Sequence, residues 1–513
     1  MPKYFLLCLL ATGFFSRVPL VNAQSRLAGE ISPLEAQTQS EVDNLLISQD
    51  KPIVVPSGSG ETISEIQVRF VDKQGNPTEG KTKPDIITRE FALQPGDVYD
   101  AELAQTGLRG VNRLFIIDQA TLDLEPTGDS DSVVMVVQVK ENSQFFFSFG
   151  LTLDPPTALN GPARPTTVIP MSDRAGGLSS GVRLGLLNLG GNNQALTLGI
   201  EGGEELFGLD LDYRKFIKHD KGYAVNFFNR QGVEPEFDGG DRDVNLDNGD
   251  DPWIGRIGGG FEVFNSIAKD FQGALGINYQ LVSARDDAFS SGLEPVDEFG
   301  NQITFSDDGQ DILLTLNFAT SLDKRNRRSN PTQGYRLLFQ TDQSIPVGDS
   351  SIFHNRLAAN YTQYLPVPLF GFREGAKTLV LNFQGGTVIG DLPPYEAFSL
   401  GGSSSVRGYG SGELGTGRSF VQTTAEYRFP IFAMSAFKKE FDIGGTLFID
   451  YATDLGSGDT VKGEPAEVRD KPGDGFGYGV GLRTLTPIGI IRLDFGINDQ
   501  GDTAVIFNIG ERF

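Results

Sequence analysis

The chain has 513 residues, which is long for one ordinary domain and predicts either several units or one large closed β structure. Its formal charge of -24 argues against nucleic acid as a partner, because phosphate binding depends on clustered Lys and Arg. Because the single cysteine is Cys8, the chain beyond it has no thiol for a disulfide, a metal site or a nucleophile.

The first residues, 1–23, have the pattern of a secretory signal peptide. Lys3 is followed by an apolar run from Tyr4 to Phe15, and then by the small-residue cleavage pattern Val21-Asn22-Ala23. A buried hydrophobic helix is the alternative interpretation. Export without disulfides is typical of a bacterial envelope protein. Residues 24–60 are polar, carry a Ser-Gly-Ser-Gly run and are predicted to form a tether.

Residues 61–141 have the pattern of a small α+β domain. The predicted elements, in chain order, are strand 63–70, helix 84–93, helix 100–113, strand 115–124 and strand 133–139. Pro84 suits the opening turn of the first helix, and Asp100 suits the N-cap of the second. Apolar residues alternate or run together in the later strands. The expected order is therefore β-α-α-β-β.

From residue 142 to 513 the sequence predicts an all-β transmembrane barrel of sixteen antiparallel strands. The segments are short, alternate in polarity, are separated by Gly, Asn and Asp, and show no helical period. No segment beyond the leader approaches the roughly 18 apolar residues of a spanning helix, so this part must cross lipid as a closed barrel. The strands are expected to begin near residues 144, 179, 194, 205, 222, 255, 271, 310, 333, 353, 376, 419, 442, 474, 489 and 504.

Alternation in the last two strands predicts which side chains face lipid. Arg492 and Asp494 are expected to face the lumen. The side chains expected on the lipid face are Ile491, Leu493, Val505, Phe507, Ile509 and Phe513. Charges inside and apolar groups outside are typical of a membrane barrel.

The terminal strand, residues 504–513, is expected to pair with the first strand, residues 144–153, and so to close the barrel at a seam. Gly510 offers little packing, which favours a separable edge at this seam. Phe507, Gly510 and Phe513 are the candidate seam and C-terminal signal residues. In this interpretation Phe513 is the signal that the host's assembly machinery recognises when it inserts the chain.

The connections between strands predict the orientation of the barrel. Long connections alternate with short turns, and the long ones include residues 233–254, 285–309 and 391–418, the last being the sixth outer loop. Two outer segments are strongly acidic, because Glu234–Asp251 and Asp286–Asp311 hold eight carboxylates each. Neither shows oxygen ligands spaced around a sharp Gly turn, so a solvated anionic surface is expected, with a cation site as the alternative.

Several short motifs occur together in the C-terminal part of the chain. They are Leu400-Gly401-Gly402, Val406-Arg407-Gly408-Tyr409, Glu426-Tyr427-Arg428-Phe429-Pro430, Phe448-Ile449-Asp450, Arg492-Leu493-Asp494 and the terminal Phe513. In this combination and order the chain resembles the BamA/TamA superfamily of outer-membrane β-barrel assembly and polypeptide-translocation proteins. The resemblance implies that residues 61–141 form a POTRA (polypeptide-transport-associated) domain, and only one such domain fits into the chain.

The resemblance also implies that the sixth outer loop folds back into the barrel and that Arg407 contacts the inner wall. Independently, strand alternation places Phe448 and Asp450 on the lumen side. We expect Arg407 to pair with Asp450, because a guanidinium grips a carboxylate through two hydrogen bonds. Glu426 and Asp494 are the second choices. The candidate loop anchor is Val406, Arg407, Gly408 and Tyr409.

By the same resemblance, the expected function is outer-membrane protein assembly and insertion, or polypeptide translocation, with client strands engaging the POTRA sheet edge and the barrel seam. The expected partners are unfolded outer-membrane or secreted polypeptides, the lipid bilayer and periplasmic accessory proteins. A two-partner-type secretion pore for one dedicated client and a passive outer-membrane channel or anchor are the alternatives. The expected location is the outer membrane of a Gram-negative-type bacterium, with the POTRA domain in the periplasm.

Neither chemical catalysis nor a cofactor or metal is expected. Gly177–Gly181 matches a nucleophile elbow, but it begins a β segment instead of joining a strand to a helix, and the only imidazole bases are His219 and His354. Gly410–Gly415 matches a dinucleotide fingerprint by letters, without the helix that must follow it.

Overall fold

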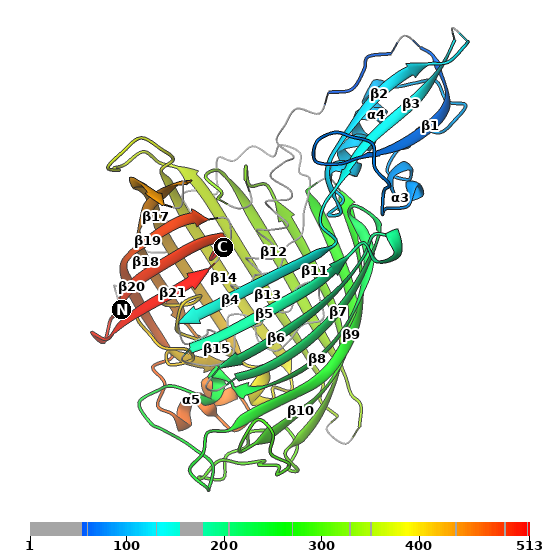
Figure 1. Cartoon of the computed structure of the whole chain (residues 1–513). Coiled ribbons are helices and arrows are strands. Elements are labelled where there is room, and N and C mark those ends of the chain that lie inside the picture. Colours follow the sequence, from blue (N-terminus) through cyan, green and yellow to red (C-terminus); the bar gives the residue numbers. More distant parts are fainter. Residues whose placement is uncertain are drawn as a thin grey trace.

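The computed structural model describes residues 54–513 apart from residues 59, 130, 154–177, 204–205, 269, 328–329, 349–350, 437–438, 487–488 and 510. The predicted signal peptide and most of the predicted tether lie outside these residues. The described chain forms a small N-terminal α+β domain and one closed barrel (Figure 1). None of the helices in this part of the chain combines the length and the apolar content needed to cross a membrane.

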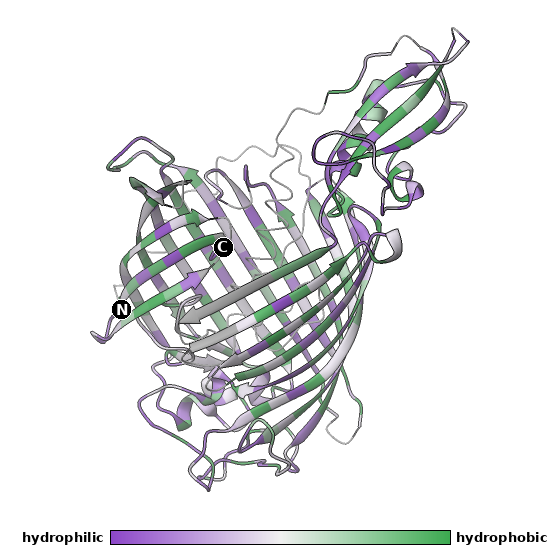
Figure 2. Cartoon of the chain, in the orientation of Figure 1, coloured by the Kyte–Doolittle hydropathy of each residue, from purple (hydrophilic) through white to green (hydrophobic). Residues whose placement is uncertain are grey.

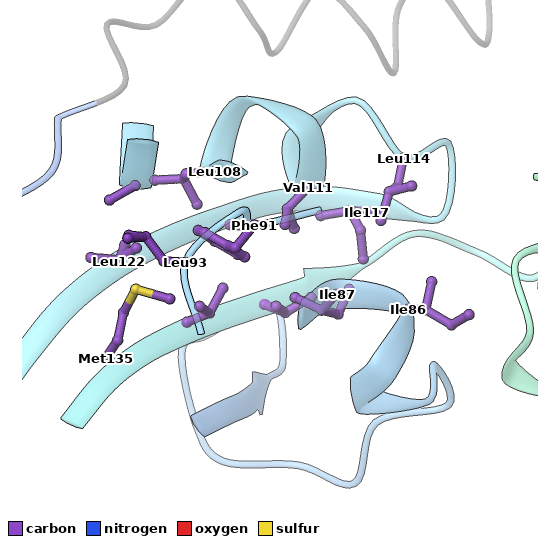
Figure 3. Packing of buried hydrophobic residues seen from close by; sticks show 14 of the residues in the cluster. Ile86, Ile87, Phe91, Leu93, Leu108, Val111, Leu114, Ile117, Leu122 and Met135 are labelled. Carbon is purple, nitrogen blue, oxygen red and sulfur yellow. The ribbon is translucent and has the colours of Figure 1, made fainter. Parts of the chain in front are cut away.

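The N-terminal domain contains β1 (Thr62–Val71), α3 (Pro84–Thr88), α4 (Ala101–Asn112), β2 (Ile117–Pro126) and β3 (Ser132–Glu141). The predicted β-α-α-β-β order is confirmed, and the sheet order is β1-β3-β2 with β1 parallel to β3. Asp100 caps α4 by accepting a hydrogen bond from the backbone N–H of Leu103 at 2.8 Å. Ile87, Leu108 and Met135 belong to the apolar core between the helices and the sheet (Figure 3).

Sixteen antiparallel strands close the barrel, as predicted, and each begins within about three residues of its expected position. The strands are β4 (Phe145–Leu153), β5 (Leu178–Leu187), β6 (Gln194–Gly203), β7 (Leu206–Lys218), β8 (Lys221–Val233), β9 (Trp253–Ala268), β10 (Phe271–Arg285), β11 (Gln310–Asp323), β12 (Gly334–Ile345), β13 (His354–Pro366), β14 (Thr378–Gly390), β17 (Ser419–Ala436), β18 (Lys439–Thr453), β19 (Asp474–Thr486), β20 (Gly489–Asn498) and β21 (Thr503–Ile509).

Alternation along the strands separates a lipid-facing wall from a polar lumen. On β18, the Leu447 and Ile449 side chains are exposed on the outer wall, whereas Thr446 and Asp450 are buried on the lumen side. Apolar and polar residues alternate in bands along the other strands as well (Figure 2). This period of two places charged groups where protein or water, and not lipid, can solvate them.

The connections contain several short elements. They are η3 (Leu189–Gly191), η4 (Pro235–Phe237), η5 (Pro394–Glu396), β15 (Phe398–Leu400), β16 (Gly415–Gly417), η6 (Gly458–Thr460) and α5 (Pro465–Val468). All except η3 lie in connections at the barrel end far from the N-terminal domain, which is called the outer end below.

The N-terminal domain is fastened to two tight turns at the near end of the barrel. Glu90 accepts a hydrogen bond from the backbone N–H of His219 at 3.2 Å, and its second oxygen lies 2.7 Å from His219 Nδ1. In the neighbouring turn, Asn188 Nδ2 donates to Thr82 Oγ1 at 2.8 Å. Because the Glu90 side chain is 1% exposed, its hydrogen bonds are shielded from water. These contacts hold the domain in one orientation on the barrel.

Candidate functional site

The connection between β14 and β17, residues 391–418 and called loop 6 below, turns back into the barrel lumen. Within it, β15 and β16 pair as a small antiparallel ribbon. The apolar side chains of loop 6 and the adjoining barrel form one buried cluster of Val388, Leu392, Ala397, Phe398, Leu400, Val406, Tyr409, Leu414, Phe420, Ala452 and Val461. Packing of this kind fills the lumen at this level with protein.

Arg407 is the charged centre of loop 6 and is completely buried. Its Nε and Nη2 donate to the two oxygens of Asp450 at 2.8 and 3.1 Å, which is the bidentate grip expected from the sequence. Its Nη1 donates to Glu426 at 2.9 Å and to Asp494 at 3.4 Å. The Arg407 guanidinium therefore contacts Asp450, the first partner considered, and also Glu426 and Asp494, the two second choices.

The aromatic ring of Phe448 packs against the Arg407 guanidinium of this ion cluster. The Arg407 guanidinium carbon lies 3.3 Å from the centroid of the Phe448 ring. A desolvated cation over an aromatic face gains about 2 kcal/mol or more. Phe448 and Asp450 are two residues apart on β18, so both point into the lumen and contact the same side chain.

The backbone of loop 6 approaches the barrel wall so closely that glycine is required on both sides. A Cβ on Gly477 of β19 would lie 1.9 Å from the Arg407 carbonyl oxygen. Gly408 has φ +113°, and a Cβ there would lie 2.6 Å from the backbone nitrogen of Asn498. The absence of a side chain at Gly477 and Gly408 therefore leaves the room that the loop backbone needs against the wall.

Val406 and Tyr409, the other two predicted anchor residues, are also buried. Val406 joins the apolar cluster, and the Tyr409 hydroxyl donates to Asp499 Oδ1 at 2.6 Å. Asp499 lies in the turn between β20 and β21, and strand alternation could not have identified it because turn residues follow no such period. The aromatic anchor thus connects loop 6 to the turn that precedes the terminal strand.

Arg512 is a partner of loop 6 that the sequence analysis missed. Its Nη1 donates to Asp450 Oδ1 at 3.0 Å and its Nη2 donates to the carbonyl oxygen of Ser405 at 2.6 Å. Asp450 therefore accepts from Arg407 and Arg512 together. The signal available in the sequence was Glu511, a charge that interrupts the apolar alternation just before the end of the chain.

The predicted position of Phe513 on the lipid face is wrong. Its side chain is buried in the lumen and packs with Tyr364 and Val380. The adjacent Glu511 and Arg512 find charged partners in the lumen that lipid cannot supply, and these draw the tail inward. Gly510, the third predicted seam residue, lies outside the described residues.

Within the described residues, the seam between the first and last strands is shorter than the predicted pairing of residues 144–153 with residues 504–513. β21 pairs with β20 over seven residue pairs but with β4 through one pair, Phe507–Leu153. Phe507 therefore lies at the seam, and the full-length ladder between residues 144–153 and 504–513 is absent from the described strands. In the part of the seam that the structure describes, both strands consequently present free edges to each other.

The outer loops cover the outer end of loop 6 through buried ion pairs. Arg256 donates to both oxygens of Glu234 at 2.7 and 2.8 Å and to Glu396 at 3.2 Å. The Tyr395 hydroxyl donates to Asp311 Oδ2 at 2.6 Å. The interpretation of both acidic segments as solvated surface is wrong for Glu234 and Asp311, because both are buried: Arg256 neutralises Glu234, and uncharged donors such as the Tyr395 hydroxyl satisfy Asp311.

Lys471, in the connection between β18 and β19, links two outer loops to loop 6. Its Nζ donates to the carbonyl oxygen of Pro235 at 2.9 Å and to Thr416 Oγ1 at 3.2 Å. Burial, assisted by the neighbouring Arg469, lowers the pKa of Lys471 to about 7. Burial and the nearby Glu234 raise the pKa of Glu236 to about 8.

No group of three or more His, Cys, Asp or Glu side chains in the described residues is arranged to hold a metal ion. The described site offers hydrogen bonds, ion pairs and strand edges.

Comparison with protein families matches residues 188–513 to the Omp85 superfamily domain. The chain is 29% identical over 458 residues to "Outer envelope protein 80, chloroplastic" of Arabidopsis thaliana, covering 88% of this chain and 57% of that protein. It is 28% identical over 479 residues to "Protein TOC75, chloroplastic" of Pisum sativum, covering 88% and 56%. The chain thus spans less than two thirds of the length of these curated relatives.

Solved structures share the fold at low sequence identity. BamA from Haemophilus ducreyi lacking POTRA domains 1-3 matches with a TM-score of 0.58 and 15% identity, covering 86% of this chain and 83% of that one. CdiB from Acinetobacter baumannii matches with a TM-score of 0.52 and 14% identity, covering 87% and 73%. Both matches extend over the barrel and beyond it, which identifies the architecture.

Proposed function

The chain belongs to the Omp85 superfamily of outer membrane and envelope proteins, and on this premise we propose that it inserts or translocates unfolded polypeptides without chemical catalysis. The proposed location is the outer membrane of a Gram-negative-type bacterium, with the N-terminal POTRA-type domain in the periplasm. The proposed partners are unfolded outer-membrane or secreted polypeptides and the surrounding lipid. Client strands engage two free edges in turn, one on the N-terminal sheet and one at the barrel seam.

The observation that carries the proposal is that, within the described residues, β21 and β4 are joined by the single pair Phe507–Leu153. An unpaired strand edge in lipid leaves backbone N–H and C=O groups without partners, which costs several kcal/mol per group. A client strand that adds to this edge supplies the missing hydrogen bonds and gains its own. Burial of the client's apolar face in lipid drives insertion, so the step needs no nucleotide.

The N-terminal sheet offers the second edge. Asn112 covers the middle of β2 by donating to the Ala120 carbonyl at 3.0 Å and accepting from its N–H at 2.8 Å. The backbone groups of Leu122 and Leu124 point the same way, because every second residue of a strand does. Within the described residues these groups have no partner on that side of β2. An extended client segment fits there by β-augmentation.

The filled lumen favours this function over a passive channel. Loop 6 and the tail occupy the barrel, and buried ion pairs such as Arg256–Glu234 fasten the outer loops over it. An open pore would not need a buried arginine held by three carboxylates. A dedicated secretion pore remains the second candidate, and it requires loop 6 to withdraw before a client can pass.

The test is the folding rate of an unfolded barrel client presented to liposomes that contain this protein. Empty liposomes and liposomes with the Arg407→Ala variant are the controls. We expect a clear acceleration by the parent protein and a smaller one by the variant. No acceleration by correctly folded protein would exclude a stand-alone insertase and leave dedicated secretion as the better explanation.

A further inference from the structure

The turn between β13 and β14, residues 367–377, lies against the outside of the barrel and is called the flap below. It belongs to the near end of the barrel, where the N-terminal domain is fastened (Figure 1). The Phe370 ring packs against two rings of β17, with centroids 5.0 Å from Tyr427 and 4.8 Å from Phe429. These two rings alternate with Arg428, which is buried on the lumen side, so they point outward. The flap therefore covers part of the lipid-facing wall.

The backbone of the flap is hydrogen-bonded within the protein. The N–H groups of Leu369 and Phe370 donate to the Tyr427 hydroxyl at 3.1 and 3.0 Å, and this hydroxyl donates to the Phe370 carbonyl oxygen at 2.8 Å. The N–H of Phe372 donates to the carbonyl oxygen of Pro430 at 3.0 Å. A turn in water does not need such internal partners, whereas lipid supplies none. The flap backbone is thus suited to a lipid environment.

The side chains on the free surface of the flap are apolar. Leu369 is 67% exposed and Phe372 is 74% exposed, and Phe370 is exposed beside them. Phe432, on the neighbouring part of β17, is about half exposed. An exposed apolar surface of this kind marks a contact with a membrane or a protein. Because the flap replaces the wall that begins with the exposed Val421 on the same strand, its surface continues a lipid-facing one.

A lysine without a partner lies beside these apolar groups. The aliphatic part of Lys377 follows the flap closely, since a Cβ on Gly371 would lie 2.8 Å from Lys377 Cε. Within the described residues, the Lys377 ammonium group has neither a hydrogen bond nor an ion pair. Arg373, the other cation of the flap, pairs with Asp442 at 2.6 Å. Long cationic side chains at a membrane surface extend their charge to the headgroups.

We propose that the flap is a binding site for an anionic glycerolipid of the leaflet on the side of the N-terminal domain. The acyl chains of the lipid lie on Leu369 and Phe372, and the headgroup receives hydrogen bonds from the Lys377 ammonium group. The bound lipid holds β14 and β17 at a fixed depth in the bilayer. This inference goes beyond the proposed function, because it requires that the barrel span a bilayer but not that it act on a client.

Fluorescence quenching by brominated lipid tests whether the flap enters the bilayer. Trp253→Phe removes the only tryptophan, and Phe372→Trp then places one on the flap. In nanodiscs whose lipids carry bromine in the upper part of the acyl chain, the emission is expected to be at least about 2-fold weaker than without bromine, as for an aromatic group at the membrane interface. If this variant does not fold, Leu369→Trp in the same background carries the same expectation.

Two control positions define the range of the quenching assay. Leu447→Trp, on the lipid-facing wall, should be quenched at least as strongly as the flap reporter. Val98→Trp, on the N-terminal domain, is expected to remain unquenched, because Val98 is 59% exposed on a domain outside the barrel. Unquenched emission from a folded flap reporter, with Leu447→Trp quenched, would overturn the proposal and assign the apolar surface to a protein partner.

The headgroup contact is tested by the same reporter. Brominated phosphatidylglycerol is added in increasing fractions to unbrominated phosphatidylcholine, and the fraction that gives half of the maximal quenching measures the relative affinity. Lys377→Gln is expected to raise this fraction about 5-fold, the effect of removing one cation from an anionic lipid surface. Lys221→Gln, which removes an exposed lysine from another turn at the near end, should leave it unchanged. An unchanged fraction in Lys377→Gln would overturn the assignment of an anionic lipid.

Discussion

Arg407→Ala is the most informative single change in the lumen, because it removes the guanidinium but leaves its three carboxylates buried. Asp450, Glu426 and Asp494 lie within 3.4 Å of Arg407 nitrogen atoms in the parent protein. The variant must either keep these charges with fewer partners or withdraw loop 6 and admit water. Both outcomes favour the withdrawn state of the loop.

The expected magnitude follows from the remaining partners. Removing one member of a buried ion pair costs roughly 3 to 5 kcal/mol. Asp450 keeps Arg512 at 3.0 Å and Glu426 keeps Arg428 at 2.8 Å, so the lower end of this range applies. Roughly 3 kcal/mol raises the population of withdrawn loop by about 10²-fold. Arg407→Lys keeps the charge but loses the bidentate geometry, and a rise of about 10-fold is expected.

Maleimide labelling of a single cysteine measures this population. Ser405 is fully buried beside Arg407, and its hydroxyl has no hydrogen-bond partner in the described structure, so Ser405→Cys is a mild reporter. Cys8→Ser removes the other thiol. Arg242→Ala, which breaks a half-exposed outer-loop pair with Asp470, is the control and should change the labelling rate by less than about 5-fold. A labelling rate in Arg407→Ala equal to that of the parent would refute the anchor.

Three further outcomes are expected. Gly477→Ala should raise the same labelling rate at least about 10-fold, because its Cβ would lie 1.9 Å from the Arg407 carbonyl, whereas Gly202→Ala, with no atom within 4 Å, should not. Glu90→Gln should weaken the fastening of the N-terminal domain by about 1 to 3 kcal/mol, seen as faster amide exchange in the turns that contact it. Above about pH 9, Glu236 is ionised whether the outer loops are closed or open, because its pKa is about 8 even when they are closed. From there up to about pH 10 the closed loops should become more stable by about 1.4 kcal/mol per pH unit. The closed state binds fewer protons in this pH range because burial lowers the pKa of Lys471 to about 7. Amide hydrogen exchange of residues 415–417 measures the stability of the closed loops. The increase in stability with pH should be absent in Lys471→Met.

The barrel was predictable from the sequence because lipid imposes a strict period of two on every strand. That period gives the sixteen strands and the lumen-facing side of β18, and it places Asp450 beside Phe448. It also places Glu426 and Asp494 on the lumen side, which is why three acceptors for Arg407 could be named in advance.

Contacts outside the strand period could not be predicted in the same way. The partner of Tyr409 is Asp499, which lies in a turn. Glu234 and Glu396, which come from two separate outer loops, both form ion pairs with Arg256. An aromatic side chain such as Phe513 suits a lipid-facing strand position and an apolar pocket in the lumen equally well. Hydropathy alone therefore could not predict which of the two positions it occupies. The charges of Glu511 and Arg512 decide the choice, because lipid offers them no partners.

Asp450 makes the loop and the tail interdependent. One oxygen of this carboxylate accepts from Nη2 of Arg407 and from Nη1 of Arg512, while the other accepts from Nε of Arg407. If the presence of the tail stabilises loop 6 in the lumen by some factor, thermodynamic linkage requires that loop 6 stabilise the tail by the same factor.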